Sequence, residues 1–165
     1  MIYRLDSDRK LLVLSSLISI AFSIMYAQVE IWLDWRKVFQ AFSSLPDLKG
    51  FPAYNWLFTN ALFLLVAFSP LIPLVAREGV SWKVVAMGFG NFFLICVVED
   101  AFYFILQGRW ITPEDNTAKI LGSFMAGDLL IPAWYPVYIV LALYLYSGAL
   151  SSGRPAGGMG YRLRI

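Results

Sequence analysis

The sequence predicts an all-α integral membrane protein: a bundle of four transmembrane helices, with a short interfacial helix between the third and the fourth. Hydrophobic residues make up 59% of the 165 residues and charged residues only 15%, whereas a soluble domain has about 45–50% apolar and about 25% charged residues. The mean hydropathy is +0.67. Because so few charges cannot cover a surface that faces water, the composition argues against a soluble enzyme, a disordered chain and a nucleic-acid-binding domain.

Long stretches without charged side chains give the positions of the helices. A bilayer core of about 30 Å requires about 20 mainly apolar residues per helix. Three stretches contain no Asp, Glu, Lys or Arg, and a fourth is interrupted only by Glu99 and Asp100. We therefore predict a single membrane domain over 1–165, with spans at about 11–33, 53–76, 83–107 and 129–149 and a polar tail over 150–165.

The segment between the third and fourth spans has the pattern of a helix start. Thr112 can cap a helix, Pro113 suits its first position, and two acidic residues follow in the first turn, where the helix dipole favours them. Four apolar residues then recur at helical spacing: Ile120, Leu121, Phe124 and Met125. We predict an interfacial helix over about 113–125.

The distribution of basic residues predicts the orientation. Eight Lys and Arg residues flank the spans on the side of the termini, and five lie on the other side. Basic loop residues favour the cytoplasmic side. We expect a multi-pass protein of the cell membrane with both termini in the cytoplasm.

The residue types that are missing limit the chemistry. The chain has no histidine and one cysteine, Cys96, which excludes His-ligated haem, a His general base and an internal disulfide. We expect no cofactor, and we expect Cys96 to be a small core residue. The candidates for a metal site are Glu30, Asp34 and Asp128, and a solvated helix end explains the first two equally well.

The acidic pair Glu99–Asp100 is the most informative feature. A carboxylate in mid-span costs about 2.5–3.5 kcal/mol on insertion scales, and the other predicted spans offer no Lys or Arg at the same depth. We expect the pair to carry at most one net negative charge unless a cation or a partner subunit neutralises it.

A polar stripe runs along the third span. Cys96, Asp100, Tyr103 and Gln107 share one helix face, and Glu99 lies about 100° around the helix from Asp100. The stripe should face protein rather than lipid. Its expected partners on other spans are Asn60, Tyr135 and Tyr138.

Residues 98–104, with the sequence VEDAFYF, resemble the acidic pair followed by aromatic residues in the heterodimeric type of integral-membrane lycopene cyclases. The resemblance implies that Glu99 or Asp100 is an acid that protonates a polyene. Tyr103 and neighbouring aromatic rings would then stabilise a carbocation. The proline that precedes the acidic pair in that family is a valine here.

Three functions stay open from the sequence. The first is a non-catalytic accessory or structural subunit of a larger membrane complex, with the acidic pair at a helix or subunit interface. Its partners would be lipids and other membrane subunits or a second copy, and no nucleic acid. The second is a membrane enzyme that acts on a lipid or isoprenoid by acid catalysis. The third is a carrier or channel that conducts protons or cations.

Overall fold

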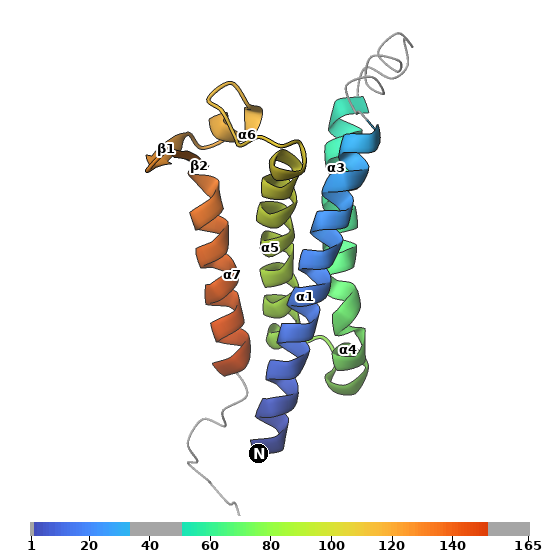
Figure 1. Ribbon diagram of the computed structural model, residues 1–165. Helices are drawn as coiled ribbons and strands as arrows, with labels where there is room; N and C mark the ends of the chain where they lie inside the picture. The colour runs from blue at the N-terminus through green and yellow to red at the C-terminus, as the bar shows by residue number, and fades with distance from the viewer. Residues whose placement is uncertain (1, 34–50, 152–165) are drawn as a thin grey trace, which may run out of the picture.

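The computed structural model describes residues 2–33 and 51–151. Within these ranges the long helices are α1 (Ile2–Leu33), α3 (Phe51–Phe68), α5 (Trp82–Leu106) and α7 (Trp134–Ser151). A 3-10 turn, η2 (Ser69–Leu71), joins α3 to α4 (Ile72–Glu78). The short elements between α5 and α7 are α6 (Asn116–Lys119), β1 (Ser123–Ala126) and β2 (Leu129–Pro132) (Figure 1).

The helices confirm the predicted fold class. Four segments are long and apolar enough to cross a membrane: Ser7–Leu33, Leu57–Glu78, Trp82–Leu106 and Trp134–Ser151. The start of α1, the end of α7 and α4 lie at one end of the bundle, which we call the α4 end. The strands and α6 lie at the opposite end, the hairpin end (Figure 1). The chain is thus a multi-pass membrane protein.

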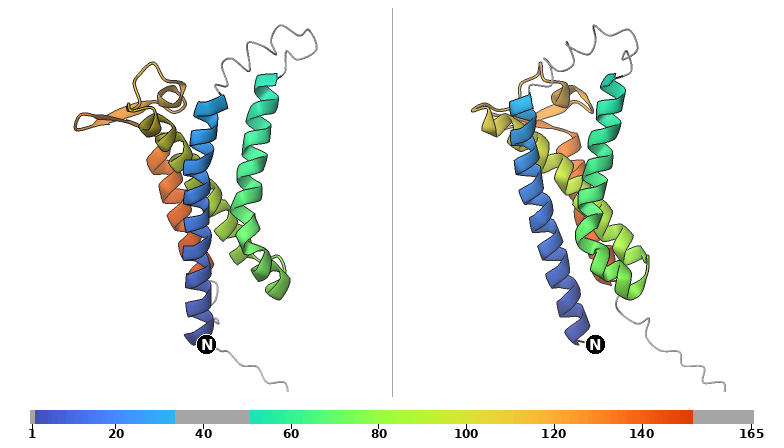
Figure 2. Two further views of the ribbon diagram at one scale, coloured as in Figure 1. Left: turned by 45° about the vertical axis from the view of Figure 1, so that its right-hand side comes forward. Right: turned by 90° about the vertical axis from the view of Figure 1, so that its right-hand side faces the viewer.

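Helix α5 lies at the centre of the bundle. It packs against α1, α3 and α7, and the last two lie on opposite sides of it (Figures 1 and 2). Small residues allow this close packing. Ser15, Ser19 and Ser23 of α1 are fully buried, and the Ser23 hydroxyl lies 3.4 Å from the Ile95 carbonyl oxygen of α5.

Two glycines of α5 make room for aromatic rings of neighbouring helices. A Cβ atom at Gly88 would collide with the Phe68 ring, and one at Gly90 would collide with the Tyr146 ring. The absence of a side chain at both positions allows these rings to contact the backbone of α5.

The interfacial helix predicted over 113–125 is wrong in extent. The helix α6 covers only Asn116–Lys119, and an antiparallel hairpin follows, with Phe124 opposite Ile131. Asp115 rather than Thr112 is the N-cap residue. Gly122 and Gly127 adopt φ values of 76° and 63°, a left-handed conformation that ends a helix and suits a tight turn.

The hairpin also moves the start of the fourth span. Residues 129–132, expected within that span, form β2, and α7 begins at Trp134. The second predicted span, 53–76, is divided by η2 into α3 and α4. Pro70 and Pro73 stand in the first turns of η2 and α4, where proline is tolerated because its missing N–H would have no helical partner.

Candidate functional site

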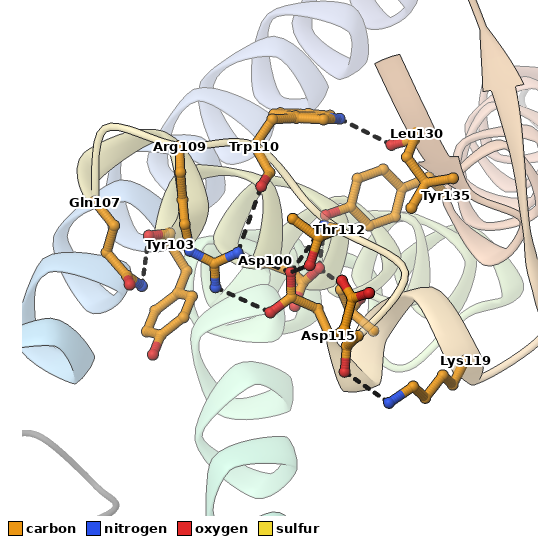
Figure 3. Close-up of polar contacts among 12 residues, drawn as sticks. Asp100, Tyr103, Gln107, Arg109, Trp110, Thr112, Asp115, Lys119, Leu130 and Tyr135 are labelled. Atoms are coloured by element: carbon orange, nitrogen blue, oxygen red, sulfur yellow. Dashed lines mark hydrogen bonds and ion pairs between the residues drawn. The ribbon is translucent and has the colours of Figure 1, made fainter. Parts of the chain in front are cut away.

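Asp100 joins α5 to two elements of the hairpin end. Its Oδ2 accepts hydrogen bonds from the Tyr135 hydroxyl of α7 at 2.6 Å and from the Thr117 hydroxyl of α6 at 2.7 Å. The Trp134 indole N–H donates in turn to the Thr117 carbonyl oxygen at 3.1 Å. Thr117, Trp134 and Tyr135 are buried, and Figure 3 shows Tyr135 directed toward Asp100. The carboxylate thus holds α6 and α7 against α5.

Glu99 faces a different helix. Its carboxyl group lies close to the Glu30 carboxyl group of α1. The Tyr26 hydroxyl lies within hydrogen-bond reach of Glu30 and 3.2 Å from the Thr59 hydroxyl of α3. Two carboxyl groups can share a hydrogen bond only if one of them holds a proton, because a carboxylate has no donor. The arrangement therefore places two carboxyl groups close together between α1 and α5.

Arg109 binds Asp115, not the acidic pair. Its guanidinium forms two hydrogen bonds to the Asp115 carboxylate, at 2.7 and 2.9 Å (Figure 3). The guanidinium also lies 4.6 Å from the centre of the Phe104 ring. Asp115 also accepts from the Thr112 backbone N–H and hydroxyl. The Arg109 guanidinium holds the pKa of Asp115 far below its ordinary value, and this ion pair raises the pKa of Arg109.

Three other residues predicted for the polar network, Cys96, Tyr103 and Tyr138, pack against the apolar cluster that contains Tyr135. Cys96 is half-buried among apolar side chains, and the Tyr138 ring packs edge-on against Trp134 with centroids 5.1 Å apart. Gln107 is exposed and donates to the Tyr103 carbonyl oxygen at 3.2 Å. Asn60 is half-buried on α3.

The predicted metal candidates do not meet in the part of the chain that is described. Glu30 contacts Glu99, and Asp128 is exposed in the turn of the hairpin. Asp34 lies outside the described residues. Residues 2–33 and 51–151 contain no group of three or more acidic or cysteine side chains suited to hold a metal ion.

Asn91 is a polar centre that our sequence analysis did not single out. It is fully buried on α5, donates to the Ala67 carbonyl oxygen of α3 at 3.1 Å and accepts from the Tyr146 hydroxyl of α7 at 2.8 Å. The Ser16 hydroxyl of α1 lies 3.4 Å from the same amide oxygen. One uncharged side chain thus connects all four long helices. Asn91 is the only asparagine in the predicted third span, but a search for charged residues does not find it.

A buried ion pair at the α4 end was also missed. The Lys83 ammonium of α5 lies 2.6 Å from the Asp8 carboxylate of α1, and both side chains are buried. Glu78 lies 3.4 Å from Lys83 and 2.8 Å from Arg77. Our sequence analysis counted Lys83 and Arg77 only as loop charges. The cluster ties the start of α1 to the junction of α4 and α5.

Comparison with known proteins does not assign the chain to a family. No family model, no curated protein and no solved structure matches the chain. The function is therefore inferred from the contacts described above.

Proposed function

We propose that this chain is a non-catalytic structural subunit of a larger membrane complex, in which the buried polar side chains fix the positions of the helices. The single observation that carries the proposal is the pair of hydroxyl groups, from Tyr135 and Thr117, that donate to one oxygen of Asp100. An acid that protonates a substrate needs its own O–H directed at that substrate. Asp100 instead acts as an acceptor between three elements of the same chain.

The rest of the polar interior supports the same role. Asn91 is engaged by α3 and α7, and Asp8 is engaged by Lys83. Polar side chains within membrane bundles stabilise helix association in this way. Helices α3 and α7 lie on opposite sides of α5 (Figure 1). The outer helices carry many exposed large apolar side chains. Neighbouring subunits would pack on these side chains beside lipid.

Affinity purification from native membranes tests the proposal. The tagged chain is extracted with a gentle detergent, separated on a native gel and analysed by mass spectrometry. We expect a partner membrane protein in constant stoichiometry across preparations. Recovery of the chain as a single species without a partner, or with only further copies of itself, would contradict the proposal. A tagged four-span protein of similar size, purified in parallel, controls for nonspecific capture.

A second candidate function is the conduction of protons, and the contact between Glu30 and Glu99 favours it. A carboxyl pair that binds a proton between two helices can exchange that proton if water reaches it from both sides. The test is proton flux into liposomes that contain the purified chain, a pH-sensitive dye and an imposed membrane potential. Glu99→Gln should abolish the flux, whereas Glu114→Gln, at an exposed position, should not. Flux no greater than in empty liposomes would eliminate this candidate.

Acid catalysis on an isoprenoid has weaker support. It depends on the resemblance of residues 98–104, and the likeness of this short segment does not extend to a family match. The contacts of Asp100 and Glu99 give both residues partners within the chain. We therefore place this function after the two others.

A further inference from the structure

The hairpin β1–β2 carries an apolar surface that the bundle does not cover. All four residues of β1 are exposed. Large apolar side chains are exposed there and just before it, with Leu121 63% and Met125 61% exposed. These residues lie between the third candidate span, which ends at Leu106, and the fourth, which begins at Trp134. Contact with the lipid around a span therefore does not by itself explain their exposure.

The base of the hairpin is fixed at the level where α7 begins. The Trp110 indole N–H donates to the Leu130 carbonyl oxygen at 2.8 Å, and the Ala133 N–H donates to the Gly122 carbonyl oxygen at 3.0 Å. Ala133 directly precedes Trp134, the first residue of the fourth span. The last residue of β2, Pro132, thus lies two residues before the first residue of the fourth candidate span.

The direction of the hairpin places its tip beside the bundle, not above it. Figures 1 and 2 show the two strands projecting sideways, across the direction of the long helices. If the helices cross the bilayer, the strands run along its surface. An isolated two-stranded hairpin is only marginally stable in water, so a surface that covers its apolar residues would stabilise it.

We propose that the hairpin β1–β2 is an interfacial membrane anchor, in which Met125, together with Leu121 just before the hairpin, enters the boundary between lipid headgroups and acyl chains. The covering surface is lipid because the strands begin beside the first residue of the fourth candidate span and run across the direction of the long helices (Figures 1 and 2). Residues 120–132 contain one acidic and no basic residue. The anchor should therefore bind zwitterionic lipid and gain nothing from anionic headgroups.

Site-directed fluorescence tests the anchor. The lone cysteine is replaced by Cys96→Ala, or by Cys96→Ser if that variant does not fold, and a single cysteine is introduced by Met125→Cys. The matched control is Glu114→Cys, in the same loop but at an exposed polar position. Both cysteines are labelled with an environment-sensitive dye, and the purified chains are reconstituted into phosphatidylcholine liposomes.

We expect a blue-shifted emission at position 125 and quenching by aqueous iodide that is several-fold weaker than at position 114. The same result is expected when phosphatidylglycerol is added to the liposomes. Equal iodide quenching at the two positions would overturn the proposal. Protection of position 125 in native membranes but not in liposomes would also overturn it, since it would assign the surface to a protein partner.

Discussion

At the scale of single residues, two adjacent acids have different partners because successive side chains of a helix point about 100° apart. Asp100 is directed to Tyr135 and Thr117, and Glu99 is directed to Glu30. Neither contact involves a basic residue. The two acids therefore connect α5 to different neighbours without a salt bridge: Asp100 to α6 and α7, and Glu99 to α1.

The hydrogen bond between Asn91 and Tyr146 should contribute measurably to stability. Interhelical hydrogen bonds in membrane proteins contribute about 0.6 kcal/mol on average and up to about 1.7 kcal/mol. In a double-mutant cycle of Asn91→Ala and Tyr146→Phe, measured by unfolding in mixed detergent micelles, we expect a coupling free energy within this range. If the loss of stability in the double variant equals the sum of the losses in the two single variants to within about 0.3 kcal/mol, the pair does not interact. Ser147→Ala, at an exposed position, combined with Tyr146→Phe is the additive control.

The Arg109–Asp115 ion pair should make stability depend on pH in a defined direction. Arg109 holds the pKa of Asp115 below its ordinary value of about 3.9. The resulting stabilisation is fully present above that value and is lost as the pH falls toward the lowered pKa. The difference in melting temperature between wild type and Arg109→Gln should be constant from pH 7 to 5 and shrink below about pH 4. A difference that is unchanged at pH 3 would contradict this assignment.

The sequence revealed the important acids but not all of their partners. Glu99 and Asp100 stand out because charges inside a span are costly. Tyr135 was among the expected partners, but Glu30 was interpreted as a possible metal ligand or a solvated helix end, and it contacts Glu99 instead. Which residues meet depends on the rotation of each helix about its axis. In α5 hydrophobic residues occur on all sides of the helix, so the sequence does not indicate that rotation.

At the scale of elements, glycine determines how closely α5 and α7 approach. Gly90→Ala should destabilise the chain by about 1–3 kcal/mol because the new methyl group collides with the Tyr146 ring. Gly148→Ala is the matched control on α7, since its Cβ would lie 3.9 Å from the nearest atom, in Trp82. There the substitution should be neutral or stabilising by about 0.4–1 kcal/mol. Unfolding free energies that rank the two variants in the opposite order would refute the packing argument.

The segment after α5 shows where helix signals mislead. Thr112, Pro113 and the acids that follow resemble a helix start, yet the Asp115 carboxylate accepts from the Thr112 N–H and hydroxyl and forms a turn. Apolar residues at 120, 121, 124 and 125 fit a helix face, but Gly122 in the left-handed region interrupts it. The long spans were predictable because a bilayer requires long apolar runs. The conformation of the segment between α5 and α7 instead depends on local hydrogen bonds.

At the scale of the whole molecule, the same end of the bundle contains the start of α1, the loop after α4 and the end of α7 (Figure 1). We predict that this end faces the cytoplasm. Single cysteines at Ser7 and Val80, both exposed, should resist a membrane-impermeant maleimide in intact cells, and one at Glu114 should react. All three variants carry Cys96→Ala. Reaction at Ser7 or Val80 from outside would reverse the orientation.

The central claim is that Asp100 fixes the arrangement of the helices by accepting hydrogen bonds from two hydroxyl groups, and that the proposed complex depends on this arrangement. The most direct test compares Asp100→Asn with Asp100→Leu by the amount of chain recovered with its partner after gentle extraction. Asparagine keeps an acceptor oxygen, so we expect recovery close to wild type. Leucine removes the oxygen to which the Tyr135 and Thr117 hydroxyls donate, at a cost of about 1–3 kcal/mol, so recovery should fall several-fold. Full recovery of Asp100→Leu, or equal loss in both variants, would contradict the account.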